Sequence, residues 1–126
     1  MSTQSNKELI TRYLAALSGN EKPGNIVDRY VTDQSLKEHI AYFEDAFPKY
    51  KLLLDDMVAE GDRVALRTTF RGVHKGEFQG IRATGKEVSI SVMLIYRIEG
   101  DKIAEHWMNA DALSLLQQLG AVPVPA

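Results

Sequence analysis

Residues 88–107 read VSISVMLIYRIEGDKIAEHW, and this stretch decides the fold that we expect for the chain. Its first half is rich in β-branched and aliphatic residues and predicts a long strand, after which Gly100-Asp101 supplies a tight turn. A second strand follows and reaches His106 and Trp107. The next segment, NADALSLLQQLG, has the spacing of a short amphipathic helix that ends at a glycine. We therefore expect a β-hairpin that lines any functional site.

The length and composition indicate one domain, residues 1–126. Hydrophobic residues make up 44% of the chain and charged residues 25%, which is ordinary for a domain with its own core. The net charge of −2 leaves no basic excess for binding nucleic acid or an anionic membrane. Cysteine is absent, which excludes disulfides, thiolate metal sites and a cysteine nucleophile. With no apolar signal core at the N-terminus, we expect a cytoplasmic protein with a loose tail at residues 121–126.

Three helices are predicted before the strands. Capping-box patterns, SNKE at residues 5–8 and SLKE at residues 35–38, predict the starts of the first and third helices. Pro23 opens the second helix and Pro48 ends the third. Apolar residues recur at spacings of three and four in these segments, so each helix should bury one face.

After residue 50 the pattern becomes that of strands. Residues 50–59 and 64–73 predict two strands joined by a turn, and residues 75–81 predict a shorter extended segment. Helices followed by antiparallel strands indicate an α+β fold, in which three N-terminal helices pack on a curved sheet and a short C-terminal helix closes the chain. Gly72 and Gly76 suggest bends in the sheet. The other sheet face needs a cover, and we expect a second copy to supply it in a homodimer.

Several motifs in the second half of the chain carry a family resemblance. They are HKGEFQGI at residues 74–81, ATGK at 83–86, RIEGDKIAEHW at 97–107, Asp111, and LLQQLG at 115–120. Through them the chain resembles the SnoaL-like polyketide cyclases of the NTF2-like superfamily. The resemblance implies an α+β cone with a mainly apolar pocket and a dimer formed through the sheet. It also implies closure of a polyketide ring by an intramolecular aldol reaction without metal or cofactor.

The positions that correspond to the acid/base pair of these cyclases are apolar in this chain. The histidine position falls on Leu94 and the aspartate position on Met108, and neither side chain can transfer a proton. The loop before the third helix is also short, because residues 33–35 run almost directly into that helix. The resemblance therefore implies the fold, whereas the chemistry has to be argued from the site.

His106 is a candidate for proton transfer. Strand alternation places Ala104, His106 and Met108 on one face of the sheet, and Glu105 and Trp107 on the other. An imidazole titrates near neutral pH and suits general acid–base catalysis. The sequence shows no evident carboxylate partner for it, so the alternative is a core histidine with a structural hydrogen bond.

Tyr96 and Asp111 are further catalytic candidates, each with a structural alternative. The Tyr96 hydroxyl could donate to a ligand carbonyl, stabilise an enolate, or make a structural hydrogen bond. Asp111 directly precedes the last helix, where an N-cap is its commonest role. His39 is expected at the border of an apolar helix face and His74 at a turn or strand edge near the surface. The histidines lack the spacing of a local chelate, so we predict no metal site.

The predicted pocket is apolar and aromatic, and it suits a small hydrophobic molecule. Its expected lining residues are Tyr13, Ile40, Phe43, Phe47, Val92, Leu94 and Met108. Two functions remain open at this point. One is a cofactor-free cyclase, isomerase or hydrolase, and the other is a non-catalytic module that binds a small molecule or a partner.

Overall fold

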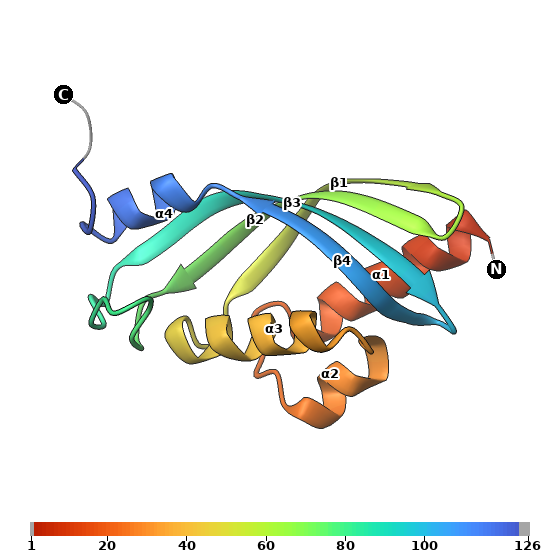
Figure 1. The fold of residues 1–126 in the computed structure, drawn as a ribbon, viewed down its shortest axis with the longest axis horizontal. Helices are drawn as coiled ribbons and strands as arrows, with labels where there is room; N and C mark the ends of the chain where they lie inside the picture. The colour runs from red at the N-terminus through yellow and green to blue at the C-terminus, as the bar shows by residue number, and fades with distance from the viewer. Residues whose placement is uncertain (1, 124–126) are drawn as a thin grey trace.

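The computed structural model describes residues 2–123 of the chain. Its elements follow one another in the order α1 (Thr3–Leu17), α2 (Gly24–Tyr30), α3 (Gln34–Ala46), β1 (Lys51–Glu60), β2 (Arg63–Val73), β3 (Glu87–Glu99), β4 (Lys102–Ala110) and α4 (Ala112–Gln118). This arrangement confirms the predicted α+β fold, with three N-terminal helices, an antiparallel sheet and a C-terminal helix (Figure 1). The expected tail at residues 121–126 lies partly outside the described residues.

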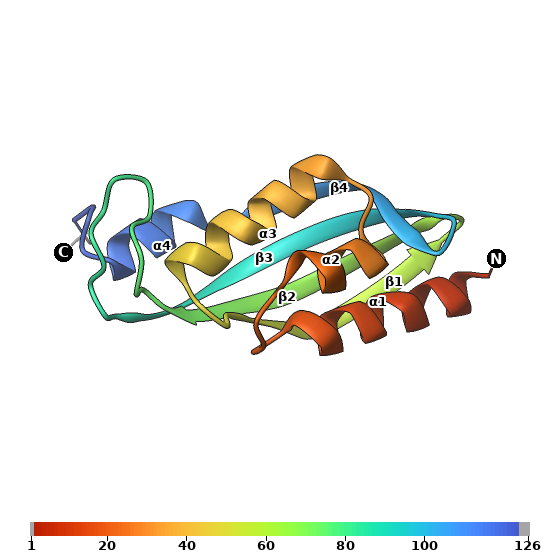
Figure 2. The ribbon, with the colours of Figure 1, turned by 90° about the horizontal axis from the view of Figure 1, so that it is seen from below.

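The four strands form one antiparallel sheet in the order β1-β2-β3-β4. The sheet arches over the first three helices, and α2 lies between α1 and α3 when the molecule is seen from the helical side (Figure 2). The ladder is interrupted between Leu54 and Asp56 in β1 and between Arg97 and Ile98 in β3. Such irregularities increase the local twist of a sheet. They take the place of the bends that we predicted at Gly72 and Gly76.

Strand β3 separates the core from the outer face by strict alternation. The side chains on its inner face are buried, and they are Val88, Ile90, Val92, Leu94, Tyr96 and Ile98. Those between them point to the opposite face and are exposed or half-buried. The inner face packs on apolar residues of α1 and α3, which produces a single core on the helical side of the sheet.

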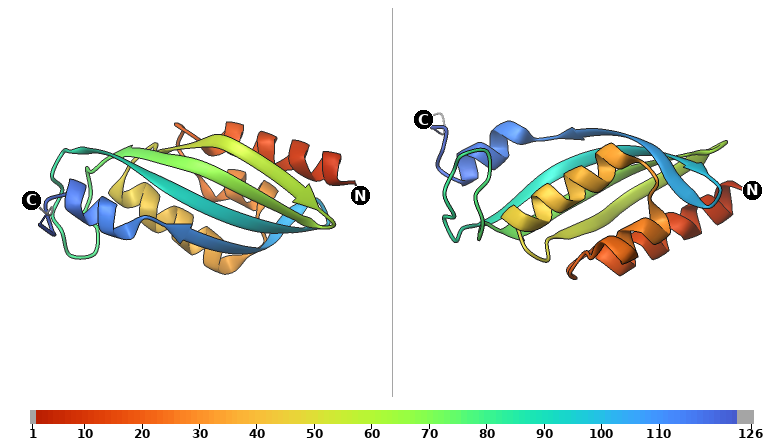
Figure 3. Two further views of the ribbon diagram at one scale, coloured as in Figure 1. Left: turned by 90° about the horizontal axis from the view of Figure 1, so that it is seen from above. Right: turned by 60° about the horizontal axis from the view of Figure 1, so that its bottom comes forward.

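The outer face of the sheet carries exposed apolar side chains. Val58, Met93, Ile95 and Trp107 are 61%, 56%, 39% and 42% exposed. In the view from above, the strands lie in front and α1, α2 and α3 lie behind them (Figure 3, left). Within residues 2–123, no helix covers this part of the sheet.

Two of the predicted helix starts were wrong. Helix α1 begins after Ser2, whose hydroxyl accepts from the Ser5 N–H at 3.0 Å, while the Ser5 hydroxyl is 3.1 Å from the Ser2 N–H. Helix α3 begins after Asp33, whose carboxylate accepts from the Leu36 N–H at 3.2 Å. In both cases the N-cap lies two or three residues earlier than predicted, because a second capping residue precedes the serine that we had chosen.

The prediction of an extended segment at residues 75–81 was also wrong. This part of the chain is a loop with one isolated bridge between Phe78 and Ile81. It turns back because the N–H groups of Lys75 and Gly76 both donate to the Ala46 carbonyl, at 3.0 and 3.1 Å. His74, expected near the surface, is fully buried, and its Nδ1 accepts from the Thr84 N–H at 3.1 Å.

Helix α4 is fixed to the end of the sheet by polar contacts. Asp111 is its N-cap and accepts from the Ser114 N–H at 3.1 Å. The Gln118 side chain accepts from the Ser89 N–H and donates to the Ser89 carbonyl, both at 2.9 Å. The amide thus pairs with β3 beyond the end of β4, as a neighbouring strand would.

Candidate functional site

A cavity of about 320 Å³ lies between the inner face of the sheet and the helices. Its walls are mainly apolar and aromatic, with a few polar groups: Tyr13, Leu36, His39, Ile40, Phe43, Tyr50, Leu52, Phe70, Phe78, Gln79, Ile90, Val92, Leu94, Tyr96, Met108, Ala110, Ala112 and Leu115. The volume is about twice the ~150 Å³ of an apolar protein cavity that binds benzene. A molecule with two fused rings therefore fits.

Most of the predicted pocket residues lie on the wall of this cavity. They are Tyr13, Ile40, Phe43, Val92, Leu94 and Met108. Leu94 and Met108 are direct cross-strand partners, so the two positions for which the resemblance implied an acid/base pair form one apolar patch. Phe47 does not line the cavity, because it is fully buried in the core, edge-on to Phe70 at a ring distance of 5.4 Å.

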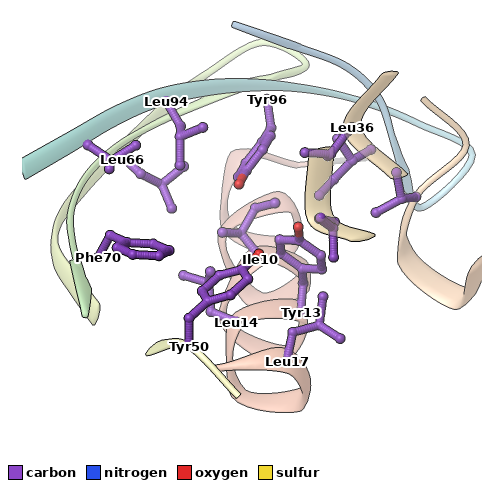
Figure 4. Close-up of a cluster of buried hydrophobic side chains, with 14 of the residues drawn as sticks. Ile10, Tyr13, Leu14, Leu17, Leu36, Tyr50, Leu66, Phe70, Leu94 and Tyr96 are labelled. Atoms are coloured by element: carbon purple, nitrogen blue, oxygen red, sulfur yellow. The ribbon is translucent and has the colours of Figure 1, made fainter. Parts of the chain in front are cut away.

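Tyr96 projects into the cavity together with two other tyrosines. Figure 4 shows the hydroxyl oxygens of Tyr13, Tyr50 and Tyr96 directed toward one another across a buried space. Burial raises the pKa of each phenol. Repulsion between the negative charges that two neighbouring phenolates would carry raises the pKa of each further. All three therefore stay protonated and act as neutral hydrogen-bond donors.

His106 has a carboxylate partner that the sequence did not reveal. Its Nδ1 lies 2.7 Å from Oδ2 of Asp33, and the two side chains are only 14% and 12% exposed. Burial opposes ionisation of Asp33, but its bonds with His106, the Ser35 hydroxyl and the Leu36 N–H outweigh that effect and lower its pKa. An ionised Asp33 can only accept a hydrogen bond, so Nδ1–H of His106 is the donor, and in the neutral tautomer of an imidazole the other nitrogen, Nε2, has a free lone pair.

The position of His106 is at the border of the cavity. It is the cross-strand partner of Tyr96 on β3, and Met108 lies two residues further along β4 on the same face. Both of those residues line the cavity, whereas His106 itself lies next to the wall, against the start of α3. The predicted alternation of β4 is confirmed for His106 inside and Trp107 outside, but it does not extend to Ala104, because the ladder shifts register there and Ile103 is the buried inner residue.

His39 lines the cavity and is electrostatically linked to His106. Its ring lies 4.4 Å from the ring of Phe43. Burial lowers the pKa of His39 to about 4, and repulsion from His106 adds to the effect. At neutral pH this imidazole is uncharged, so it offers one donor and one acceptor to the cavity.

Asp111 takes the structural role that its sequence position favoured. Its carboxylate caps α4, and its side chain is exposed, although Ala110 and Ala112 on either side line the cavity. No group of three or more histidine, aspartate or glutamate side chains in the described part of the chain could hold a metal ion. No helix in that part is long and apolar enough to cross a membrane.

Comparison with known proteins places this geometry in a family. The model of the SnoaL-like polyketide cyclases matches residues 4–119. The chain belongs to this family. The match spans all four strands and all four helices, so it includes the first half of the chain, where the sequence motifs were weakest. A comparison with curated proteins gave no match.

Several solved structures share the fold. AclR from Streptomyces galilaeus, described as a candidate hydroxylase, is 28% identical with a TM-score of 0.85, over 99% of this chain and 87% of that one. TsrD from Streptomyces laurentii is 30% identical with a TM-score of 0.83, over 97% and 99% of the two chains. IdmH from Streptomyces antibioticus, described as a candidate polyketide cyclase, is 21% identical with a TM-score of 0.75, over 91% and 98%, which shows the fold alone.

Three ionisable residues of the site were missed or undervalued from the sequence. Asp33 was treated as part of a shortened loop, yet it brings a carboxylate to His106. His39 was placed at the border of a helix face, and Tyr50 was read only as the start of a strand; both line the cavity. A usable signal existed for Asp33, since an aspartate three residues before Leu36 is itself a capping pattern.

Proposed function

We propose that this protein is a cofactor-independent enzyme that moves a proton on a small hydrophobic carbonyl compound, in the manner of a cyclase or isomerase. The observation that carries the proposal is the pair formed by Asp33 and His106 at the border of an apolar cavity. A carboxylate that fixes the tautomer of an imidazole is a recurrent arrangement in general-base catalysis. The lack of cysteine suits an enzyme of the reducing cytoplasm.

In the proposed reaction, Nε2 of His106 removes a proton from the carbon next to a substrate carbonyl. The electron pair of the C–H bond moves into an enolate, whose oxygen accepts a hydrogen bond from the Tyr96 hydroxyl. In a cyclase the enolate carbon then bonds to a second carbonyl carbon of the same molecule, and His106 returns its proton to the new alkoxide. In an isomerase, the proton returns to another carbon.

Asp33 acts in this scheme as a positioning residue. Its carboxylate accepts the Nδ1 proton of His106 throughout and stabilises the imidazolium that forms for part of the cycle. The apolar positions Leu94 and Met108 do not oppose the scheme, since Tyr96 and His106 form the next cross-strand pair on the same face, two residues along each strand. Leu94 and Met108 then serve to hold the apolar part of the substrate.

The proposal is tested by following exchange of the α-protons of 2-tetralone, a two-ring enolisable ketone, in D₂O by NMR. We expect the wild-type protein to accelerate exchange and His106→Ala to lose about 10²–10⁴-fold of that rate, as expected for removal of a general base. Asp33→Asn keeps a good N-cap but loses the carboxylate, so it should retain the fold and lose part of the rate. Equal exchange by wild type and His106→Ala would remove His106 from the mechanism and favour a protein that only binds its ligand.

We also propose a homodimer formed through the outer face of the sheet. A groove of about 530 Å³ crosses this face, lined among others by Val58, Met93, Ile95 and Trp107. An exposed apolar surface of this kind is typical of an interaction site. Arg63 lies 4.9 Å above the Trp107 ring, which orients the indole at the edge of the groove.

A further inference from the structure

Three tyrosine side chains from different parts of the chain meet at one buried place in the cavity. Tyr13 comes from α1, Tyr50 from the residue before β1, and Tyr96 from β3. Their side chains converge so that the three hydroxyl oxygens face a common space (Figure 4). Packing alone does not account for this arrangement, because each buried hydroxyl requires a hydrogen-bond partner.

The rings are held in place by their neighbours. The Tyr50 ring contacts Nζ of Lys22, which lies 3.9 Å from its centre, and the ring of Phe70, whose centre is 4.9 Å away. The Tyr13 ring meets that of Tyr96 edge-on at 5.8 Å and that of Tyr30 at 5.9 Å. Aromatic rings packed in this way have little freedom to turn, so the direction of each hydroxyl is set before any ligand enters.

The protein supplies few acceptors for these three donors. Among residues 2–123, the tyrosine hydroxyl that makes a hydrogen bond to the backbone is that of Tyr42, which accepts from the Gln79 N–H at 2.7 Å. Tyr13 and Tyr96 lie close enough for each to influence the pKa of the other, and Tyr50 in turn raises that of Tyr96. The Tyr13 and Tyr96 hydroxyls are coupled by a hydrogen bond, and no hydrogen bond in the described residues joins the Tyr50 hydroxyl to either of them. At least one O–H of the three is therefore available to a ligand.

We propose that Tyr13, Tyr50 and Tyr96 form a subsite that binds one oxygen atom of the ligand, so that the ligand class is flat hydrophobic compounds with a carbonyl, enol or phenol oxygen at one end. Neutral donors in an apolar cavity suit an oxygen that is uncharged or becomes partly negative during reaction. A free carboxylate fits less well, since the wall of the cavity offers it no cation among the described residues.

This subsite rests on the proposed function in one respect: both place the ligand in the same cavity. In that scheme Tyr96 contacts the enolate oxygen, and the subsite adds Tyr13 and Tyr50 as further donors to the same atom. The geometry therefore orients the substrate, with its oxygen end between Tyr13 of α1 and Tyr96 of β3, and its remaining rings along Phe43, Leu94 and Met108.

The test compares the binding of 2-naphthol with that of naphthalene, which have the same rings but differ in one oxygen. Dissociation constants are measured by fluorescence for the wild-type protein and for Tyr50→Phe, Tyr13→Phe and Tyr96→Phe. We expect the wild type to bind 2-naphthol about tenfold or more tightly than naphthalene. Each phenylalanine variant should reduce that ratio by about three- to tenfold and leave naphthalene binding nearly unchanged.

Tyr30→Phe is the matched control, because its ring packs on Tyr13 but does not line the cavity. It should keep the wild-type ratio. Equal affinity of the wild type for the two compounds, or failure to bind either, overturns the subsite, and this comparison needs no variant to fold. Variants that bind 2-naphthol as the wild type does also overturn it.

The two proposals fail in different ways. If the wild-type protein exchanges the protons of 2-tetralone through His106 but does not distinguish 2-naphthol from naphthalene, the tyrosine subsite is wrong and the acid–base proposal stands. If it distinguishes them but His106→Ala exchanges as fast as wild type, the subsite stands and the role of His106 is wrong.

Discussion

His39 makes the stability of this protein depend on pH in a way that one substitution should remove. The ring lines the cavity, contacts Phe43 at 4.4 Å and makes no hydrogen bond within the described residues. Burial, assisted by repulsion from His106, lowers its pKa from 6.5 to about 4. His39→Phe keeps an aromatic ring of similar size beside Phe43 and removes the titrating group.

The sign follows from proton binding in the two states. Above pH 6.5, His39 is neutral in the folded and unfolded chains and contributes nothing. Between pH 6.5 and 4, the unfolded chain takes up a proton at this position and the folded protein does not, so stability falls as the pH falls. The shift corresponds to at most about 3.4 kcal/mol, and solvent around the partly exposed ring reduces this to about 1–2 kcal/mol.

Urea denaturation at about pH 7.5 and pH 4.5 measures the effect. When the pH is lowered from about 7.5 to 4.5, the free energy of unfolding of the wild-type protein should fall by about 1–2 kcal/mol more than that of His39→Phe. The reason is that only the wild type has a titrating imidazole at this position. NMR titration of the ring provides an independent check, and in His106→Gln the His39 pKa should move back toward its ordinary value. A normal His39 titration near pH 6.5, or an unchanged pH dependence in His39→Phe, would refute the reasoning.

Three further predictions concern the helix cap, the outer sheet face and the loop after β2. Asp33→Ala should lower the free energy of unfolding by about 1–2 kcal/mol in urea denaturation, and more than Asp33→Asn does, because asparagine also caps. In light scattering the wild type should have the mass of a dimer and Met93→Arg the mass of a monomer. Leu113 on α4 is about as exposed as Met93 but lies off the outer sheet face, so Leu113→Arg should remain dimeric. A monomeric wild type would contradict the proposed dimer. Gly76→Ala should lower the thermal midpoint strongly, because its new Cβ would collide with the Asp45 carbonyl, whereas Gly24→Ala has open space around it and should not.

The sequence was informative where a single periodicity determined the structure. The alternation in residues 88–107 predicted the hairpin, its inner face, and His106 and Trp107 on opposite faces of the sheet. It could do so because strand geometry leaves only two directions for a side chain. Asp111 was correctly favoured as a cap, since its role depends on its immediate neighbours. In such segments the structure that the neighbouring residues favour is the one that the folded protein adopts.

The sequence was uninformative where distant parts of the chain meet. Asp33 and His106 are 73 positions apart, and no local pattern indicates that the start of α3 lies against β4. The role of Tyr50 could not be predicted from its neighbours in the sequence. It depends on Tyr13 and Tyr96, which reach the same space from a helix and a strand. His74 was misplaced for the same reason, since the loop that buries it is set by contacts with the end of α3.

The wrong cap of α3 and the missed partner of His106 have one physical cause. The two carboxylate oxygens of Asp33 have separate roles: Oδ1 accepts from the Leu36 N–H and the Ser35 hydroxyl, and Oδ2 contacts His106. Had Ser35 been the cap, as its pattern suggested, the carboxylate would be free to turn away. Because the cap holds it, Asp33 cannot rotate without exposing the first turn of α3. The backbone geometry of the helix start therefore fixes the orientation of the imidazole, as the proposed role of His106 as a base requires.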